Sequence, residues 1–113
     1  MKLFFSLMRW HAIKWPKLNK IFSTWNGVKF ESEQAAIRAK TTGLVAGVPD
    51  IIWPVKNDRF SGLWLEMKIK PNRPTEKQLE FIELLNSEGY HAQVVWSARE
   101  AEEVVINYIN NKL

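Results

Sequence analysis

Two carboxylates and one ammonium group occur close together on two apolar segments in the middle of the chain. Asp50 opens the segment DIIWPV, and Glu66 and Lys68 lie in GLWLEMKI, after a turn at residues 57–62. Side chains alternate along a strand, so Glu66 and Lys68 share one face with Trp64, about 6.5–7 Å apart along the strand. If the two segments pair as a hairpin, Asp50 lies beside this polar face.

This combination of side chains fits the hydrolysis of a phosphodiester. The reaction needs a way to offset charge on the phosphate and to make water nucleophilic, and a divalent cation does both. Mg²⁺ or Mn²⁺ prefers oxygen ligands, and Mg²⁺ typically takes one or two carboxylates. Asp50 and Glu66 supply that number, with the backbone carbonyl of Met67 as a further oxygen. Lys68 could orient the attacking water or stabilise charge on the phosphate.

A purely structural interpretation of the same residues is open. Glu66 and Lys68 would then be the solvated face of a strand whose other face is apolar, and Asp50 would be a turn residue after Pro49. The whole arrangement argues against it, because Gly-Val-Pro-Asp, an apolar strand, a turn and a second strand with E-x-K resemble the PD-(D/E)xK nucleases. We expect Asp50, Glu66 and Lys68 to form an active site on a polar face outside the core.

Local signals predict an α/β fold in the order α-β-α-β-β-α-β-α, a mixed sheet flanked by helices. Ser32 caps a helix that stops at Gly43, and two capping boxes, Thr75 with Gln78 and Ser97 with Glu100, begin later helices. The two central strands should form an antiparallel hairpin, and the last strand should run parallel to its neighbour. The expected elements are helix 2–15, strand 20–25, helix 33–42, strands 50–55 and 62–69, helix 76–87, strand 90–96 and a helix after Ser97.

Composition places these elements in one globular domain over residues 1–113, without a membrane span. The chain has no cysteine, which excludes disulfides, thiolate metal sites and cysteine nucleophiles and fits the cytoplasm. No apolar run reaches the roughly 18–20 residues that span a bilayer. The net charge of +4 favours an anionic partner such as nucleic acid, although many ordinary domains are equally basic.

The basic residues are concentrated near the amino terminus, where residues 1–30 contain no acid. Lys14, Lys17 and Lys20 are therefore candidates for DNA binding, and a solvated helix surface is the alternative. Trp64 is the one tryptophan that alternation places beside Glu66, so it is a further candidate for DNA contact.

The sequence resembles the virus-type replication-repair nuclease (VRR-NUC) domain, a branch of the PD-(D/E)xK superfamily with a restriction-endonuclease-like fold. The resemblance implies metal-dependent DNA cleavage, with Asp50 and Glu66 as ligands and Lys68 as catalytic lysine. It also places Gln78 where the family has a glutamine that could face the site; closing the capping box is its other role. Matching stretches are WNGVK (25–29), EQAA (33–36), TGLVAGVPD (42–50), GLWLEMK (62–68) and TEKQ (75–78).

One departure from that family concerns a glutamate that the first helix usually contributes to the acidic site. Residues 1–15 contain no acid, so either that residue lies upstream of the given start or the site works with two carboxylates. Glu31 and Glu33 are the only acids before Asp50, and neither is assigned to the metal.

The expected function is that of a Mg²⁺- or Mn²⁺-dependent endonuclease acting on branched DNA, similar to a Holliday junction resolvase, from a bacterium or its phage. A flap or single-site nuclease and a non-catalytic DNA-binding module with a degraded site are the alternatives. Symmetric cutting of a junction is simplest for a homodimer, and six tryptophans and six phenylalanines would supply apolar surface for its interface.

Overall fold

The computed structural model describes residues 1–24 and 31–113. Residues 25–30 lie outside the described residues, and with them the WNGVK stretch and the end of the strand expected at 20–25. The helices and strands follow the expected order, with one short 3₁₀ helix in addition. They are α1 (Lys2–His11), the 3₁₀ helix η1 (Pro16–Lys20), β1 (Phe22–Ser23), α2 (Glu33–Thr41), β2 (Ile51–Trp53), β3 (Leu63–Met67), α3 (Glu76–Ser87), β4 (His91–Val95) and α4 (Ala98–Ile109).

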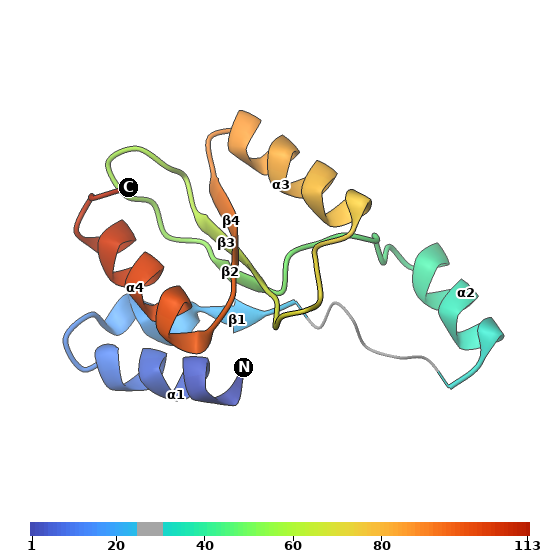
Figure 1. The fold of residues 1–113 in the computed structure, drawn as a ribbon, viewed down its shortest axis with the longest axis horizontal. Helices are drawn as coiled ribbons and strands as arrows, with labels where there is room; N and C mark the ends of the chain where they lie inside the picture. The colour runs from blue at the N-terminus through green and yellow to red at the C-terminus, as the bar shows by residue number, and fades with distance from the viewer. Residues whose placement is uncertain (25–30) are drawn as a thin grey trace.

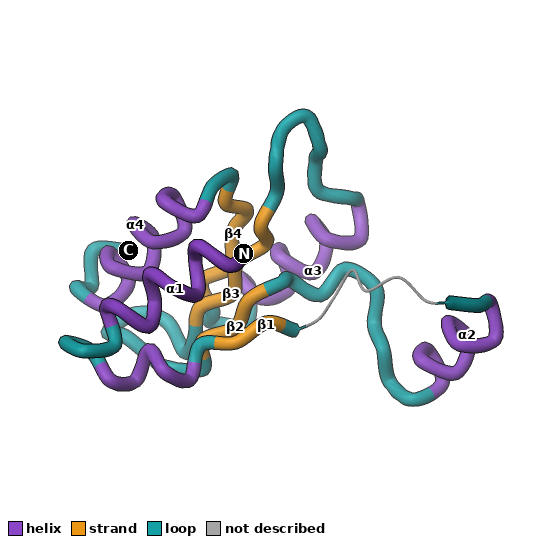
Figure 2. The backbone as a smooth tube through the Cα atoms, turned by 90° about the horizontal axis from the view of Figure 1, so that it is seen from below, coloured by secondary structure: helices purple, strands orange, loops and turns teal. Residues whose placement is uncertain are grey.

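The four strands form one mixed sheet in the order β1-β2-β3-β4. Strands β2 and β3 form the expected antiparallel hairpin, with Ile51 opposite Leu65, and β4 runs parallel to β3. Helices α1 and α4 pack together on one face, and α3 covers the other (Figure 1). Helix α2 stands away from the sheet in both views (Figure 2). The predicted α/β class and element order are confirmed, and none of the helices in the described residues could span a membrane.

The alternation along β3 is confirmed, but Glu66, expected on a polar face outside the core, is buried. Leu63 and Leu65 are buried in the core formed with α1 and α4. Trp64 lies on the other side, half-buried against the rings of Phe81 and Tyr90. Glu66 shares the side of Trp64, yet only 2% of it is exposed, because α3 closes over this face.

The amino-terminal elements are shorter than predicted. Helix α1 ends at His11 instead of residue 15, and Trp15, which precedes Pro16, lies outside the helical region (φ −123°, ψ 84°). Pro16 then starts the 3₁₀ helix η1, where proline is well tolerated because its missing N–H has no helical partner. Among the described residues 20–24, the strand expected at 20–25 is limited to the two residues of β1.

The helix caps follow the sequence signals closely. Thr75 and Gln78 form the complete capping box that begins α3. The second predicted box is only half formed, because the Ser97 hydroxyl accepts from the Glu100 amide while the Glu100 carboxylate accepts from the amide of Trp96 instead of Ser97. Gly43 follows α2 with φ +105°, the backbone for which glycine is favoured.

One polar contact joins α1 to α4 and gives a testable contribution to stability. Nε2 of His11 lies 2.7 Å from Oε2 of Glu102, and both side chains are largely shielded from solvent. The hydrogen bond with His11, together with Arg99, lowers the pKa of Glu102. This stabilisation is present above the ordinary glutamate pKa near 4.3 and is lost as pH falls through the lower folded value.

We therefore expect Glu102→Gln to lower the free energy of unfolding by about 1 kcal/mol at pH 7. Urea unfolding of both proteins from pH 7 to pH 3 measures the difference, which should shrink below about pH 4. A difference that stays constant over this range would show that the ionised carboxylate is not responsible.

Candidate active site

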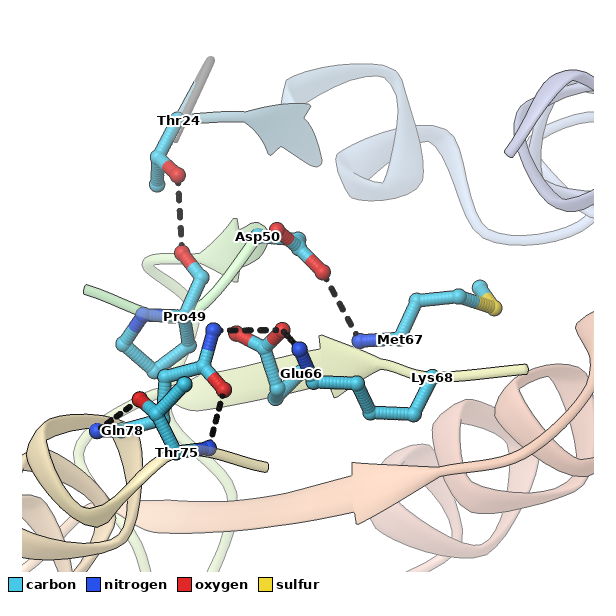
Figure 3. Close-up of polar contacts among 8 residues, drawn as sticks. All are labelled: Thr24, Pro49, Asp50, Glu66, Met67, Lys68, Thr75 and Gln78. Carbon is cyan, nitrogen blue, oxygen red and sulfur yellow. Dashed lines mark hydrogen bonds and ion pairs between the residues drawn. The ribbon is translucent and has the colours of Figure 1, made fainter. Parts of the chain in front are cut away.

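Asp50 is held at the entrance of β2 by the preceding segment of the chain. The Thr24 amide donates to the Asp50 carbonyl and the Thr24 hydroxyl to the Pro49 carbonyl, each at 2.8 Å. The Asp50 side chain turns toward β3, where Oδ2 accepts a 2.9 Å hydrogen bond from the Met67 amide (Figure 3). These contacts fix the carboxylate beside the end of the hairpin partner strand.

Glu66 occupies the centre of the site. Its Oε2 lies 3.6 Å from Nζ of Lys68 and accepts a 3.4 Å hydrogen bond from Nε2 of Gln78. Its other oxygen, Oε1, is buried and has no hydrogen-bond partner among residues 1–24 and 31–113. Figure 3 shows these side chains gathered with Asp50 at the end of β3.

The electrostatics of Glu66 reflect a shortage of positive charge. Burial raises its pKa most, and the nearby Asp50 carboxyl raises it further. Lys68 acts in the opposite direction without cancelling these effects, so the pKa of Glu66 is about 8. A buried carboxylate with an unpartnered oxygen beside a second carboxylate costs free energy unless another cation or a proton is present.

Gln78 takes part in both contacts that its position allows. Its side-chain oxygen accepts from the Thr75 amide in the capping box, while its side-chain nitrogen donates to Glu66. The capping box therefore orients the amide that holds the Glu66 carboxylate. The Gln78 side chain therefore both closes the capping box and faces the candidate site, the two roles considered from the sequence.

Two supporting residues were missed in the sequence. Thr24 fixes the Pro49–Asp50 backbone, and nothing in the expected strand at 20–25 indicated this contact. Gly47 has φ +92°, and a Cβ there would lie 2.5 Å from the backbone oxygen of Lys77. For Gly47, the Gly-Val-Pro-Asp motif was a usable signal, because glycine permits a close approach between the loop and the first turn of α3.

The residues predicted to bind DNA lie apart from this cluster. Lys14, Lys17 and Lys20 are exposed, and the Lys17 carbonyl accepts a hydrogen bond from the indole of Trp53, at the opposite end of β2 from Asp50. Trp64 lies on the face of Glu66 but packs beneath α3. The structure thus brings together Asp50, Glu66, Lys68 and Gln78, with Met67 between two of them, and leaves the lysines at a distance.

The donor set of this cluster fits a divalent cation such as Mg²⁺ or Mn²⁺. The unpartnered Oε1 of Glu66 and the Asp50 carboxylate are hard oxygen ligands in the number that Mg²⁺ usually takes from protein. Within residues 1–24 and 31–113, no group of three or more His, Cys, Asp or Glu side chains could hold a metal. Glu33 lies on the separate helix α2. A third carboxylate is therefore not found among the described residues.

Comparisons with known proteins agree with this geometry. A model of the VRR-NUC domain family matches residues 5–99, a range that contains Asp50, Glu66 and Lys68. A solved structure described as a VRR_NUC domain protein is 25% identical in sequence, with a TM-score of 0.69. That similarity covers 93% of this chain and 87% of the other. A search of curated proteins found no significant match.

Proposed function

The chain belongs to the VRR-NUC family of nucleases, and from this premise we propose that it is a metal-dependent endonuclease that hydrolyses DNA at Asp50, Glu66 and Lys68. The observation that carries the proposal is the buried Glu66, which lies beside the Asp50 carboxyl and has one oxygen without a hydrogen-bond partner among the described residues. If Glu66 and Lys68 formed a purely structural ion pair, a protein hydrogen-bond donor would be expected for that buried Glu66 oxygen. A non-catalytic module would have no need to keep this arrangement.

Each side chain then has a distinct part in hydrolysis. Asp50, Glu66 and the Met67 backbone carbonyl would hold Mg²⁺ or Mn²⁺, which when bound supplies positive charge near the phosphate and lowers the pKa of a water. The Met67 amide and the Gln78 side chain keep the two carboxylates oriented. Lys68 places its ammonium beside Glu66, where it can donate to a phosphate oxygen or to the attacking water.

A cleavage assay tests this function and separates it from the alternatives. Labelled duplex, flap and four-way junction DNA would each be incubated with the protein and Mg²⁺, Mn²⁺ or EDTA. We expect cuts only with metal, and most rapidly in the branched substrates. Cutting of flaps alone would favour the single-site alternative, and binding without cutting of any substrate would leave only a DNA-binding module.

Since DNA is the substrate and the chain lacks cysteine, we expect the enzyme to act in the cytoplasm.

We further propose that Lys14, Lys17 and Lys20 contact the phosphate backbone of one DNA arm. All three are exposed and cationic, and release of counterions from DNA should make their contribution depend on salt. Charge reversal of the three together should weaken junction binding strongly at low salt and flatten the salt dependence. Fluorescence anisotropy in EDTA from about 50 to 200 mM salt measures this. Affinity that ignores both salt and the triple variant would contradict the assignment.

The homodimer is proposed on the basis of α2. A nine-residue helix is only marginally stable without tertiary packing, and α2 contains no buried residue. Its apolar side chain Ile37 is 55% exposed. Leu84 of α3 is also a large apolar side chain that is exposed to solvent. Leu84 borders a groove of about 350 Å³ that also includes Val45 and Phe81.

The distribution of charge supports a second copy of the chain as the occupant of this groove. Helix α2 ends with Arg38 and Lys40, whereas α3 carries three glutamates and one lysine. In a two-fold dimer, α2 of each copy would lie in the groove of the other, and two equal sites would face a junction.

Light scattering at micromolar concentration should therefore give twice the chain mass of 13.2 kDa. Ile37→Glu should shift the protein toward the monomer, whereas Ile13→Glu, at a residue 83% exposed on the segment after α1, should not. A wild-type mass near 13.2 kDa would refute the dimer.

A further inference from the structure

A second concave site lies at the end of the sheet away from Asp50. It is a pocket of about 480 Å³ between the segment that follows α1, the loop between β2 and β3, and the carboxyl end of α4. Figure 1 shows these three segments together on the side of the molecule opposite α2. A volume of this size is in the usual range of small-molecule sites. None of the proposed metal ligands or catalytic residues lines it.

The floor of the pocket is aromatic and rigid. Trp53 and Tyr108 are buried and meet edge to face, with ring centroids 5.9 Å apart. Their polar atoms are already used, since the Trp53 indole N–H donates to the Lys17 carbonyl and the Tyr108 hydroxyl to the Val55 carbonyl. The floor is therefore closed, and the aromatic surface that the pocket offers a ligand is the partly exposed ring of Trp15.

The rim of the pocket is cationic. Lys14, Lys17 and Lys56 line it together with a single carboxylate, Asp58. In the described part of the chain none of these three lysines forms an ion pair. The Lys14 ammonium lies 4.7 Å from the ring centroid of Trp15, a half-buried residue that lines the same pocket. A ligand that fits both parts must combine a flat apolar group with negative charge.

We infer that this pocket binds one unpaired nucleotide of the DNA substrate, with its base against the ring of Trp15 and its phosphate among the rim lysines. Stacking on aromatic side chains beside a basic surface is how proteins bind single-stranded DNA. A base within a duplex is already stacked and could not enter a concave site without leaving its partner. Because this inference rests on the proposed nuclease function, the ligand is a part of the same DNA that is cut.

The distance from the metal ligands is compatible with this role. Asp50 and Trp53 are three residues apart along β2, about 10 Å at the rise of a strand. Trp53 faces the core beside α4, whereas Glu66 faces α3, so a DNA strand that joins the pocket to the phosphate at Asp50 would have to pass from one face of the sheet to the other. The pocket would select branched DNA or DNA with unpaired ends over an intact duplex.

The test is a binding measurement in EDTA, in which no substrate is cut. Fluorescence anisotropy would compare a blunt duplex, the same duplex with a short single-stranded flap, and that flap with abasic residues. We expect wild-type protein to bind the natural flap about tenfold more tightly than the blunt duplex, and the abasic flap to lose most of this gain. Equal affinity for the natural flap and the blunt duplex, or for the natural and abasic flaps, would overturn the inference.

Two charge reversals complete the experiment. Lys56→Glu changes an exposed rim residue and should remove most of the preference for the flap. Lys2→Glu makes the same charge change at the amino end of α1, and Lys2 does not line the pocket. This variant should weaken flap and duplex binding equally. A Lys56→Glu variant that keeps the wild-type preference would overturn the inference. Because cleavage plays no part in these measurements, a failure to cut DNA would count against the proposed nuclease function alone.

Discussion

Replacing Glu66 by glutamine is expected to lower the rate of metal-dependent DNA cleavage by roughly a hundredfold or more. The substitution keeps the shape of the side chain but removes the charge that would bind the cation. It also removes a buried ionisable group that, without metal, must either take up a proton or carry its charge beside Asp50, and both cost free energy at neutral pH. We therefore expect the metal-free protein to unfold at the same temperature as wild type or at a higher one.

Cleavage rates and thermal unfolding in EDTA measure the two effects separately. Glu103→Gln is a matched control, because Glu103 is an exposed carboxylate on α4, and it should leave both quantities unchanged. Wild-type cleavage by the Glu66 variant would contradict the site, and a large loss of stability without metal would contradict the electrostatic account.

Replacing Gly47 by alanine is expected to destabilise the fold by roughly 2–4 kcal/mol. Alanine is strained at φ +92°, and its Cβ would lie 2.5 Å from the Lys77 carbonyl oxygen, which belongs to helix backbone and cannot rotate away. The loop must then move away from α3. Because this loop leads directly to Asp50, cleavage should fall as well.

Gly43→Ala separates backbone strain from that collision. Gly43 has a similar φ of +105°, but a Cβ there would have no neighbour within 4 Å. Its cost should be limited to roughly 1–2 kcal/mol of backbone strain, with little effect on cleavage. Urea unfolding of both variants gives the comparison, and equal losses of stability would show that the contact with Lys77 is unimportant.

The parts of the fold that the sequence predicts well are those set by neighbouring residues. The Thr75–Gln78 capping box correctly locates the start of α3, and glycine at position 43 locates the end of α2. Alternation in β3 places Trp64 and Glu66 on the side opposite Leu63 and Leu65. The convergence of Asp50, Glu66 and Lys68 also follows, because a hairpin has few registers that keep the apolar side chains on the core face.

The features that the sequence does not predict depend on tertiary packing. Alternation identifies the face of Glu66 but not that α3 closes over it and buries the carboxylate. Lysines near the amino terminus are evident from their charge, yet only the fold places Lys14 and Lys17 around an aromatic pocket with Lys56. The contact between Thr24 and Pro49 joins distant segments, and no local pattern indicates it.

Titration of Mn²⁺ into the wild-type protein and into Asp50→Asn, followed by calorimetry, tests the central claim most directly. The side chain of Asp50 is half-buried beside Glu66, and asparagine can keep its hydrogen bond from the Met67 amide. We predict at least one bound ion per wild-type chain, and binding at least about tenfold weaker in the variant. Equal Mn²⁺ binding by the two proteins, or none by the wild type, would contradict a metal site at Asp50 and Glu66.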